Sequence, residues 1–350
     1  MANGSRRVGG MDLGDRFSHV WIGDAEGICC GKGRVATTRE SMTRYFGSQD
    51  PMVVAIEVGT HSPWVERVLR KAGHEVIVAN PRKVRLVYAS RKKNDKLDAE
   101  KLARLARLDP KLLFPIRHRS EDEERHLVLV KSRTALVETR VQLINHLRGI
   151  VKSRGERLPK CSSEAFAGKA ATYLGKDPAT APVVQMIAHL TVSIRQYDRE
   201  IESVAAKEYP ETGHMQTVSG VGPITALTFR LVVQSPERFP NARDVGPYLG
   251  LQPRQCQSGD SDPQLGITKA GDVYLRSLLV QASHYILGPF GPDTDLRRWG
   301  LALAARGGNR AKKRAVVAVA RKLAVLLLTL WKRREIYQPL RHDAVQEAAA

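Results

Sequence analysis

The order of strand-like and helix-like segments in the first 107 residues limits the fold more than any other feature of the chain. Three short stretches with strand character come first, with turn residues 24 to 27 before the third: Val8 to Leu13, Ser18 to Gly23 and Ile28 to Arg34. Three strands in succession predict a meander. Alternating helices and strands are expected next, at 39–46 (helix), 52–57 (strand), 64–72 (helix), 75–79 (strand) and 96–107 (helix).

This order predicts an α/β domain over residues 1–115 with a mixed sheet flanked by helices. Three strands followed by helix, strand, helix, strand and helix is the arrangement of a ribonuclease-H-like (RuvC-like) domain. At 350 residues the chain is long enough for two or three domains, each with a core of its own.

Residues 116–210 are predicted to hold two long helices and a linker. Ser120 and Glu123 form a capping-box pattern that opens a helix reaching about Lys152. Apolar residues step by three and four in this helix and again over residues 187–204, the spacing of a coiled-coil seam. The two helices can pack antiparallel within one chain or pair with a second copy, and the spacing favours neither. Residues 155 to 182, rich in Gly, Pro, Ser and Lys, have the composition of a linker.

Residues 211–342 are expected to form a second functional domain, mainly α-helical and strongly basic at its end. Between Arg297 and Arg341, thirteen Lys and Arg face a single acid, Glu335, and the whole chain carries a net charge of +20. Such a surplus favours nucleic acid as the partner, with steeply salt-dependent binding. Candidate phosphate contacts in this segment are Lys312, Lys313 and Arg314. A solvated helix face is the alternative interpretation of the basic run.

Membrane and secreted proteins do not fit the sequence. The most apolar stretch, 315–331, is interrupted by Arg321 and Lys322 and is too short to span a bilayer. The first residues lack the apolar run of a secretory signal. Four cysteines include no CxxC pair, so neither a disulfide framework nor a zinc site is expected. The protein is expected in the cytoplasm, associated with the nucleoid.

Four acids recur at the ends of the predicted elements: Asp12, Glu57, Asp95 and Asp98. The last two are three residues apart and share a helix face, and in this fold that helix packs beside the first strand, so all four acids can converge. Clustered carboxylates repel one another unless a cation is present, which implies Mg²⁺ sites. Two such ions roughly 4 Å apart activate an attacking oxygen and stabilise the leaving one. Asp95 as a helix N-cap and Asp98 as a helix-dipole acid are the structural alternatives.

A glycine-rich turn in the second half resembles a helix-hairpin-helix. In Val218-Ser219-Gly220-Val221-Gly222-Pro223, the glycines Gly220 and Gly222 permit a tight turn whose backbone N–H groups, at a helix start, can hold a phosphate. A plain connecting turn is the alternative.

A serine-containing loop follows at residues 254–260. Ser258 directly precedes Gly259, and by spacing alone a turn residue is the simpler interpretation. No histidine lies beside it, so a nucleophilic role needs a metal ion or carboxylates from another chain. Lys269 and Arg276, farther on, are candidate phosphate contacts.

Taken together, these motifs resemble the DEDD-type insertion-sequence transposases. That family is related to the pilin-gene invertase, and its members are also called bridge recombinases because a noncoding bridge RNA guides them. The resemblance spans nearly the whole chain. It rests on residues 11–14 (MDLG), 56–64 (IEVGTHSPW), 73–76 (GHEV), 93–99 (KNDKLDA), 221–226 (VGPITA), 248–251 (YLGL), 258–259 (SG), 268–271 (TKAG) and 275–276 (LR).

The resemblance implies that Asp12, Glu57, Asp95 and Asp98 are metal ligands and that Ser258 forms a transient phosphoserine bond with DNA. Cys256 and Gln257 depart from the family pattern just before it, so Ser261 is the neighbouring candidate. Dimers and tetramers, in which the acids of one subunit serve the serine of another, are also implied.

Three functions are compared on this basis. The first is an RNA-guided recombinase that cuts and rejoins DNA. The second is a Holliday-junction-type nuclease that uses the acids and water and does not need Ser258. The third is a non-enzymatic nucleic-acid-binding protein, which predicts that Asp12→Ala changes no DNA processing.

Overall fold

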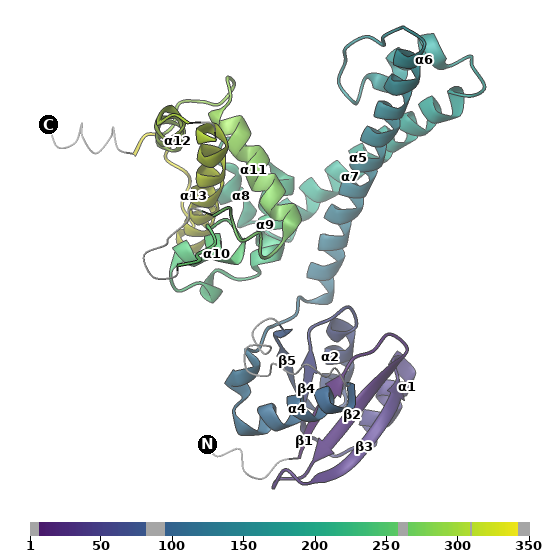
Figure 1. The fold of residues 1–350 in the computed structure, drawn as a ribbon, viewed down its shortest axis with the longest axis vertical. Helices are drawn as coiled ribbons and strands as arrows, with labels where there is room; N and C mark the ends of the chain where they lie inside the picture. Colours follow the sequence, from purple (N-terminus) through teal and green to yellow (C-terminus); the bar gives the residue numbers. More distant parts are fainter. Residues whose placement is uncertain (1–6, 82–94, 258–264, 309, 342–350) are drawn as a thin grey trace, which may run out of the picture. The chain divides into compact units, whose positions relative to one another are not determined.

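The computed structural model describes residues 7–81, 95–257, 265–308 and 310–341. The side chains of Asp95 and Lys96 are also outside the description. The chain folds into two compact units, residues 1–120 and 121–350, and each is considered by itself (Figure 1). Among the described residues, no helix is long and apolar enough to cross a membrane.

Unit 1 is built on a mixed five-stranded sheet with the order β3-β2-β1-β4-β5. The first three strands form an antiparallel meander, as predicted, and β4 and β5 run parallel to β1. The strand bounds are β1 (Val8–Asp12), β2 (Phe17–Gly23), β3 (Cys29–Ala36), β4 (Val53–Glu57) and β5 (Glu75–Ala79). Each predicted strand is present, with ends that differ by no more than two residues. The topology is consistent with a ribonuclease-H-like domain.

Helices cover both faces of this sheet (Figure 1). The helices α1 (Arg39–Gly47) and α2 (Ser62–Lys71) pack on one face, where Met11, Ile22 and Ile56 point. The helix α4 (Asp95–Leu108) packs on the other face, over Val8, Val53 and Ala55. The short 3₁₀ helix η1 (Pro110–Leu113) follows α4. Because side chains alternate along a strand, each strand contributes to both cores.

Gly10 allows α4 to approach the sheet closely. A Cβ atom at this position would lie 2.0 Å from the carbonyl oxygen of Ala99 and 2.6 Å from the amide nitrogen of Ala103. Any other residue would push α4 away from β1. Gly10 therefore fixes the height of α4 above the strand that ends at Asp12.

Unit 2 begins with an antiparallel helical hairpin formed by α5 (Glu121–Ser153) and α7 (Ala181–Lys207). The start of α5 packs against the end of α7, with Leu127 and Val130 beside Ile201 and Val204. The end of α5 packs against the start of α7, where Ile144 and Leu147 meet Ile187. The predicted seams thus meet within one chain.

The middle of the hairpin departs from the predicted apolar seam. Val141 is 41% exposed, and the neighbouring Arg140 is buried instead. Its Nη1 donates to Oγ1 of Thr191, 3.3 Å away, and burial lowers the pKa of this guanidinium. Beside it, Nε of Arg133 lies 2.7 Å from Oδ1 of Asp198. A polar layer therefore separates two apolar ends.

The prediction that residues 155–182 form a linker is wrong for their central part. The helix α6 (Phe166–Leu174) lies there, and Phe166, Ala170 and Leu174 are buried against α5 and α7. The segment is rich in Gly, Ser and Lys, but its few apolar residues are spaced to lie on one helix face. These residues cover the tip of the hairpin.

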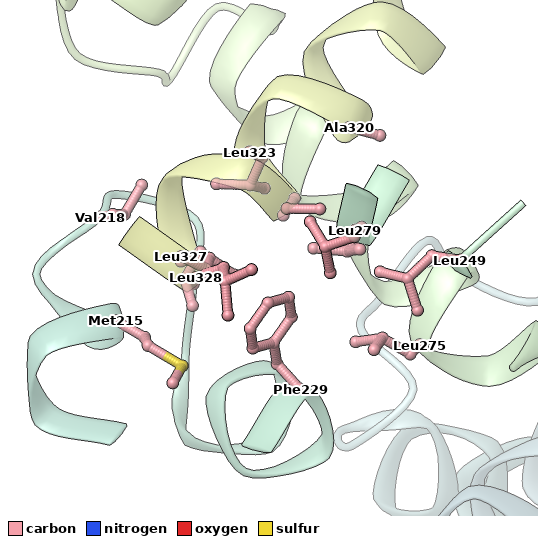
Figure 2. Packing of buried hydrophobic residues seen from close by; sticks show 14 of the residues in the cluster. Met215, Val218, Phe229, Leu249, Leu275, Leu279, Ala320, Leu323, Leu327 and Leu328 are labelled. Carbon is pink, nitrogen blue, oxygen red and sulfur yellow. The ribbon is translucent and has the colours of Figure 1, made fainter. Parts of the chain in front are cut away.

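The rest of unit 2 is a helical bundle around a single core (Figure 2). Phe229 lies fully buried among Met215, Leu275 and Leu327 in this core. The longest helix of the bundle, α13, buries one face along most of its length. The helices are α8 (Thr212–Gln216), α9 (Pro223–Val233), α10 (Val245–Tyr248), α11 (Val273–Leu287), α12 (Asp295–Ala305) and α13 (Ala311–Arg333), with short 3₁₀ turns at Pro236–Arg238 and Ala242–Asp244.

Candidate functional site

Two of the four candidate acids end neighbouring parallel strands. Asp12 is the last residue of β1 and Glu57 the last residue of β4, and Met11 is paired with Ile56 just before them. Along both strands, every second residue faces α4, including Val8 and Val53. Asp12 and Glu57 continue this alternation, so both lie on the α4 side of the sheet at the same edge.

The helix α4 carries the other two candidate acids. It begins at Asp95, whose side chain is outside the described residues, and Asp98 lies one turn later. Because Ala99 contacts Gly10, the first turns of α4 lie over the second half of β1. Asp98 is partly exposed, and its Oδ1 lies 3.2 Å from Nζ of Lys101.

Within the described residues, no three His, Cys, Asp or Glu side chains are grouped closely enough to hold a metal ion. The backbone directs Asp12 and Glu57 to one edge and one face, with α4 above them, and the side chain of Asp95 lies outside the described residues. Oxygen-only ligands of this kind suit a hard cation such as Mg²⁺. The donor set and the strand register therefore fit such an ion, while a complete coordination shell is not formed by the described side chains.

A set of residues that the sequence reasoning missed lies next to Asp12. His19 of β2 is paired with Asp12, and Arg34 of β3 is paired with His19. A hollow of about 500 Å³ opens here between the two strands and α4, and Lys32 and Leu97 also line it. The guanidinium of Arg34 lies 3.9 Å from the centre of the partly exposed Phe17 ring. Alternation along the predicted strands was the signal that links these residues to Asp12.

Ser258 and Ser261 lie outside the described residues, but the chain on either side of them is described. Pro253 and Ile267 form an antiparallel bridge. The amide of Arg254 donates to the carbonyl of Gly266 over 3.0 Å, and the amide of Thr268 donates to the carbonyl of Gln252 over 2.9 Å. Both ends of the serine segment are therefore held together in a short two-stranded stem.

The stem is anchored by two glycines and an arginine. Gly250 and Gly271 have φ angles of +68° and +71°, and a Cβ at either would lie 2.2 Å from a backbone atom. Arg276 is only 8% exposed. Its Nη1 donates to the carbonyls of Leu249 and Ala270 over 3.0 and 2.7 Å. Arg276 was expected to contact phosphates, but in this structure its guanidinium joins the two ends of the stem.

The glycine-rich turn connects the short helix α8 to α9. Gly220 has a φ angle of +89°, and a Cβ there would lie 2.9 Å from the Tyr285 ring, so this glycine permits close packing on α11. Gly222 precedes α9, is exposed, and has open space where a Cβ would be. Pro223 at the first position of α9 leaves no donor there, and no side chain caps this helix.

The remaining basic candidates are exposed on the surface of unit 2. Lys269 follows the stem and has a left-handed backbone with a φ angle of +56°. Lys312, Lys313 and Arg314 occupy the first turn of α13. Cations at a helix start oppose the helix dipole, so their placement is unfavourable for the isolated helix and suits an external anion.

Comparisons with known proteins match both halves of the chain. The transposase family DEDD_Tnp_IS110 matches residues 9–154, and the family described as "Transposase IS116/IS110/IS902 family" matches residues 213–293. The chain is 30% identical to the transposase for insertion sequence element IS1111A of Coxiella burnetii, over 72% of this chain and 70% of that protein. It is 27% identical to a probable family 20 transposase of Pseudomonas aeruginosa, over 94% and 98%. It is 26% identical to the pilin gene-inverting protein of Moraxella bovis, over 77% and 76%.

Proposed function

The chain is a transposase of the IS116/IS110/IS902 family, and from this membership we infer that it cuts and rejoins DNA with two sets of residues, the carboxylates of unit 1 and a serine of unit 2. The observation that carries the inference is the strand geometry at the edge of the sheet. Asp12 and Glu57 end adjacent parallel strands and face α4 together. A buried sheet seldom ends in two neighbouring acids unless they bind something.

In this proposal Asp12, Glu57, Asp95 and Asp98 hold Mg²⁺. Bound Mg²⁺ would supply positive charge to the phosphate oxygens of DNA and promote deprotonation of the attacking hydroxyl. The protein's own part is to fix the distance between the sheet and α4. Gly10 sets that distance. Lys101 forms an ion pair with Asp98, and in the proposal Asp98 exchanges this ion pair for the metal ion.

The attacking group in the proposal is the hydroxyl of Ser258. Its oxygen forms a bond to the phosphorus of the DNA backbone, and the bond from phosphorus to one deoxyribose oxygen breaks. The serine proton is lost and the leaving oxygen gains one. Rejoining is the reverse reaction with another DNA end, so no free energy source is required. The stem at Pro253 and Ile267 supports this role because it holds the serine segment at both ends.

The DNA contacts in the proposal are the exposed groups of unit 2. They are the backbone of Gly220 and Gly222 and the side chains of Lys269, Lys312, Lys313 and Arg314. A noncoding bridge RNA guides the enzyme to its target, and a homo-oligomer, dimer or tetramer, brings the acids of one subunit to the serine of another. The proposal of these two partners rests on the family resemblance and on the net charge of +20.

The first test is a search for a covalent protein–DNA adduct on denaturing gels. Wild type, Ser258→Ala, Ser261→Ala and Asp12→Ala are incubated with element-end DNA, Mg²⁺ and RNA transcribed from the flanking region. We expect an adduct with wild type and Ser261→Ala and none with the other two. Cleavage without an adduct, unchanged in Ser258→Ala, would instead establish the nuclease that uses water. Unchanged DNA processing in Asp12→Ala would remove the catalytic role of the acids.

A further inference from the structure

A basic hollow lies beside the stem of the serine segment in unit 2. Its volume is about 790 Å³, within the range of roughly 300–1,000 Å³ that holds ligands of drug size, and a nucleotide is of that size. One wall is α13, another is Trp299 of α12, and the third is the stem itself. The stem residues in the wall are Leu251, Pro253 and Leu265 to Ile267.

Every charged side chain in the part of the rim that the structure describes is positive. These described residues are six cations: Arg243, Arg310, Lys313, Arg314, Arg321 and Lys322. Among the described residues, none of the six has a side-chain ion pair or hydrogen bond. Six neighbouring cations without acids repel one another, and the repulsion is relieved by a polyanion.

The floor of the hollow is apolar. Val317, Ala318 and Val325 of α13 and Ile267 of the stem form it. Trp299 is 37% exposed, a large fraction for a tryptophan on a helix, and the Nζ of Lys322 lies 4.3 Å from the centre of its ring. An exposed indole beside a cation offers a flat face for a base and a charge for the adjoining phosphate.

The cationic rim and the apolar floor together favour one kind of polyanion over another. A DNA duplex keeps its bases stacked inside, and it would meet the rim with its phosphates but leave the apolar floor uncovered. A strand with unpaired bases can place bases on the floor and on Trp299 while its phosphates meet the rim, as in proteins that bind single strands. Because the stem supplies part of the wall, the bound strand is the one that reaches the serine segment, which is DNA.

We propose that this groove binds unpaired nucleotides of the DNA strand next to the point of cleavage, with a base stacked on Trp299 and phosphates on the cations of α13. The proposal rests on the proposed function in one respect, the identity of the strand as the one that is cut. It implies that the duplex is opened at the cleavage point before or during the reaction. Trp299 is then a binding residue for an unpaired base.

The test measures binding without chemistry. Fluorescence anisotropy of a labelled single-stranded DNA of about 12 nucleotides is recorded with the full chain in the Ser258→Ala background, without Mg²⁺. We expect Trp299→Ala to weaken binding by about 5-fold or more, since loss of one stacked base has an effect of that size. The affinity for duplex DNA should change by less than about 2-fold, because the substitution leaves the phosphate contacts in place. The matched control is Tyr173→Ala, an exposed aromatic on α6 at the other end of unit 2.

A second variant keeps the test valid if Trp299→Ala fails to fold. Trp299→Phe retains a stacking ring, and it should bind the strand within a few-fold of wild type while losing the quenching of tryptophan emission that the strand causes. Equal binding of single-stranded DNA by Trp299→Ala and wild type would overturn the proposal, and so would tighter binding of RNA than of DNA of the same sequence. Because neither readout uses Ser258, a failed adduct assay and a failed binding assay are distinguishable.

Discussion

The two units place their charged side chains in opposite ways. In unit 1, acids end the strands of a sheet whose geometry is fixed by backbone pairing, and the position of α4 above them is set by the contact at Gly10. In unit 2, cations line one exposed face of a helix and the walls of an open hollow. Strand ends hold a side chain to within a fraction of an ångström, whereas long cationic side chains adapt to whatever anion approaches.

The difference teaches what each region is suited to do. In the proposed function the carboxylates share a metal site and act as a set, so losing one removes the function of all. Cations that meet phosphates contribute separately, so losing one weakens binding by a small and similar amount wherever it occurs. Four substitutions test this contrast, and the first has the largest expected effect.

Asp12→Asn should lower the rate of DNA cleavage by about 100-fold or more, because one ligand of a charge-stabilising site contributes several kcal/mol to the barrier. The rate is measured with element-end DNA at saturating Mg²⁺. The control is Asp50→Asn. Asp50 is an exposed aspartate just before the start of β4, and its substitution should leave the rate unchanged. A loss of less than 10-fold would mean that the acids contribute additively, like the cations, and the contrast would fail.

Arg276→Met should open the stem of the serine segment. Two carbonyls lose a charged donor in a buried place, which costs about 2–4 kcal/mol of local stability. Hydrogen exchange at the amides of Arg254 and Thr268 reports this opening, because both amides bond across the stem. If exchange there is unchanged while DNA binding falls, Arg276 contacts phosphate and not the stem.

Gly10→Ala should destabilise unit 1 by about 1–3 kcal/mol, since the added methyl group meets the backbone of α4. Faster hydrogen exchange in β1 and α4 is the expected measurement, together with a loss of cleavage. Gly47→Ala at the end of α1 is the control, because nothing lies within 4 Å of a Cβ there. Unchanged exchange in Gly10→Ala would show that α4 is not held against β1.

Lys313→Gln should have the smallest effect. Single-stranded DNA binding should weaken only a few-fold near physiological salt, and the slope of log affinity against log salt should fall by about 0.7. Lys169→Gln on α6, also exposed, is the matched control and should leave the slope unchanged. A loss above 100-fold from this one cation would show that the rim works as a cooperative set.

The sequence predicted unit 1 closely because its signals are local. Each strand and helix has its own run of apolar residues, and the meander followed from the short spacing of the first three strands. The same local reasoning placed Asp12 and Glu57 at strand ends. Alternation placed His19 and Arg34 on one face of their strands, but it could not pair Arg34 with His19, because that register depends on the turn at residues 24–27 and on a bulge near Gly23.

In unit 2 the prediction was least accurate where tertiary contacts override composition. Residues 166–174 were assigned to a linker because glycine, lysine and serine surround them, yet they form a helix once the ends of α5 and α7 offer an apolar surface. Arg276 was grouped with phosphate contacts by its charge, and nothing in its neighbours shows that two carbonyls would meet it. The hollow beside Trp299 joins residues from five separate segments, which no single motif contains.

The polar layer in the helical hairpin fixes how α5 aligns with α7, and thereby the length of the hairpin. Sliding α5 against α7 by one turn would move Arg140 from Thr191 to an apolar partner and leave a guanidinium buried beside it without an acceptor, so only one alignment is favourable. A hairpin with a single alignment has a single length. A helix of 33 residues spans about 50 Å at 1.5 Å per residue, the length of about 15 base pairs of duplex. The hairpin therefore sets a single separation between α6 at its tip and the helical bundle at its base.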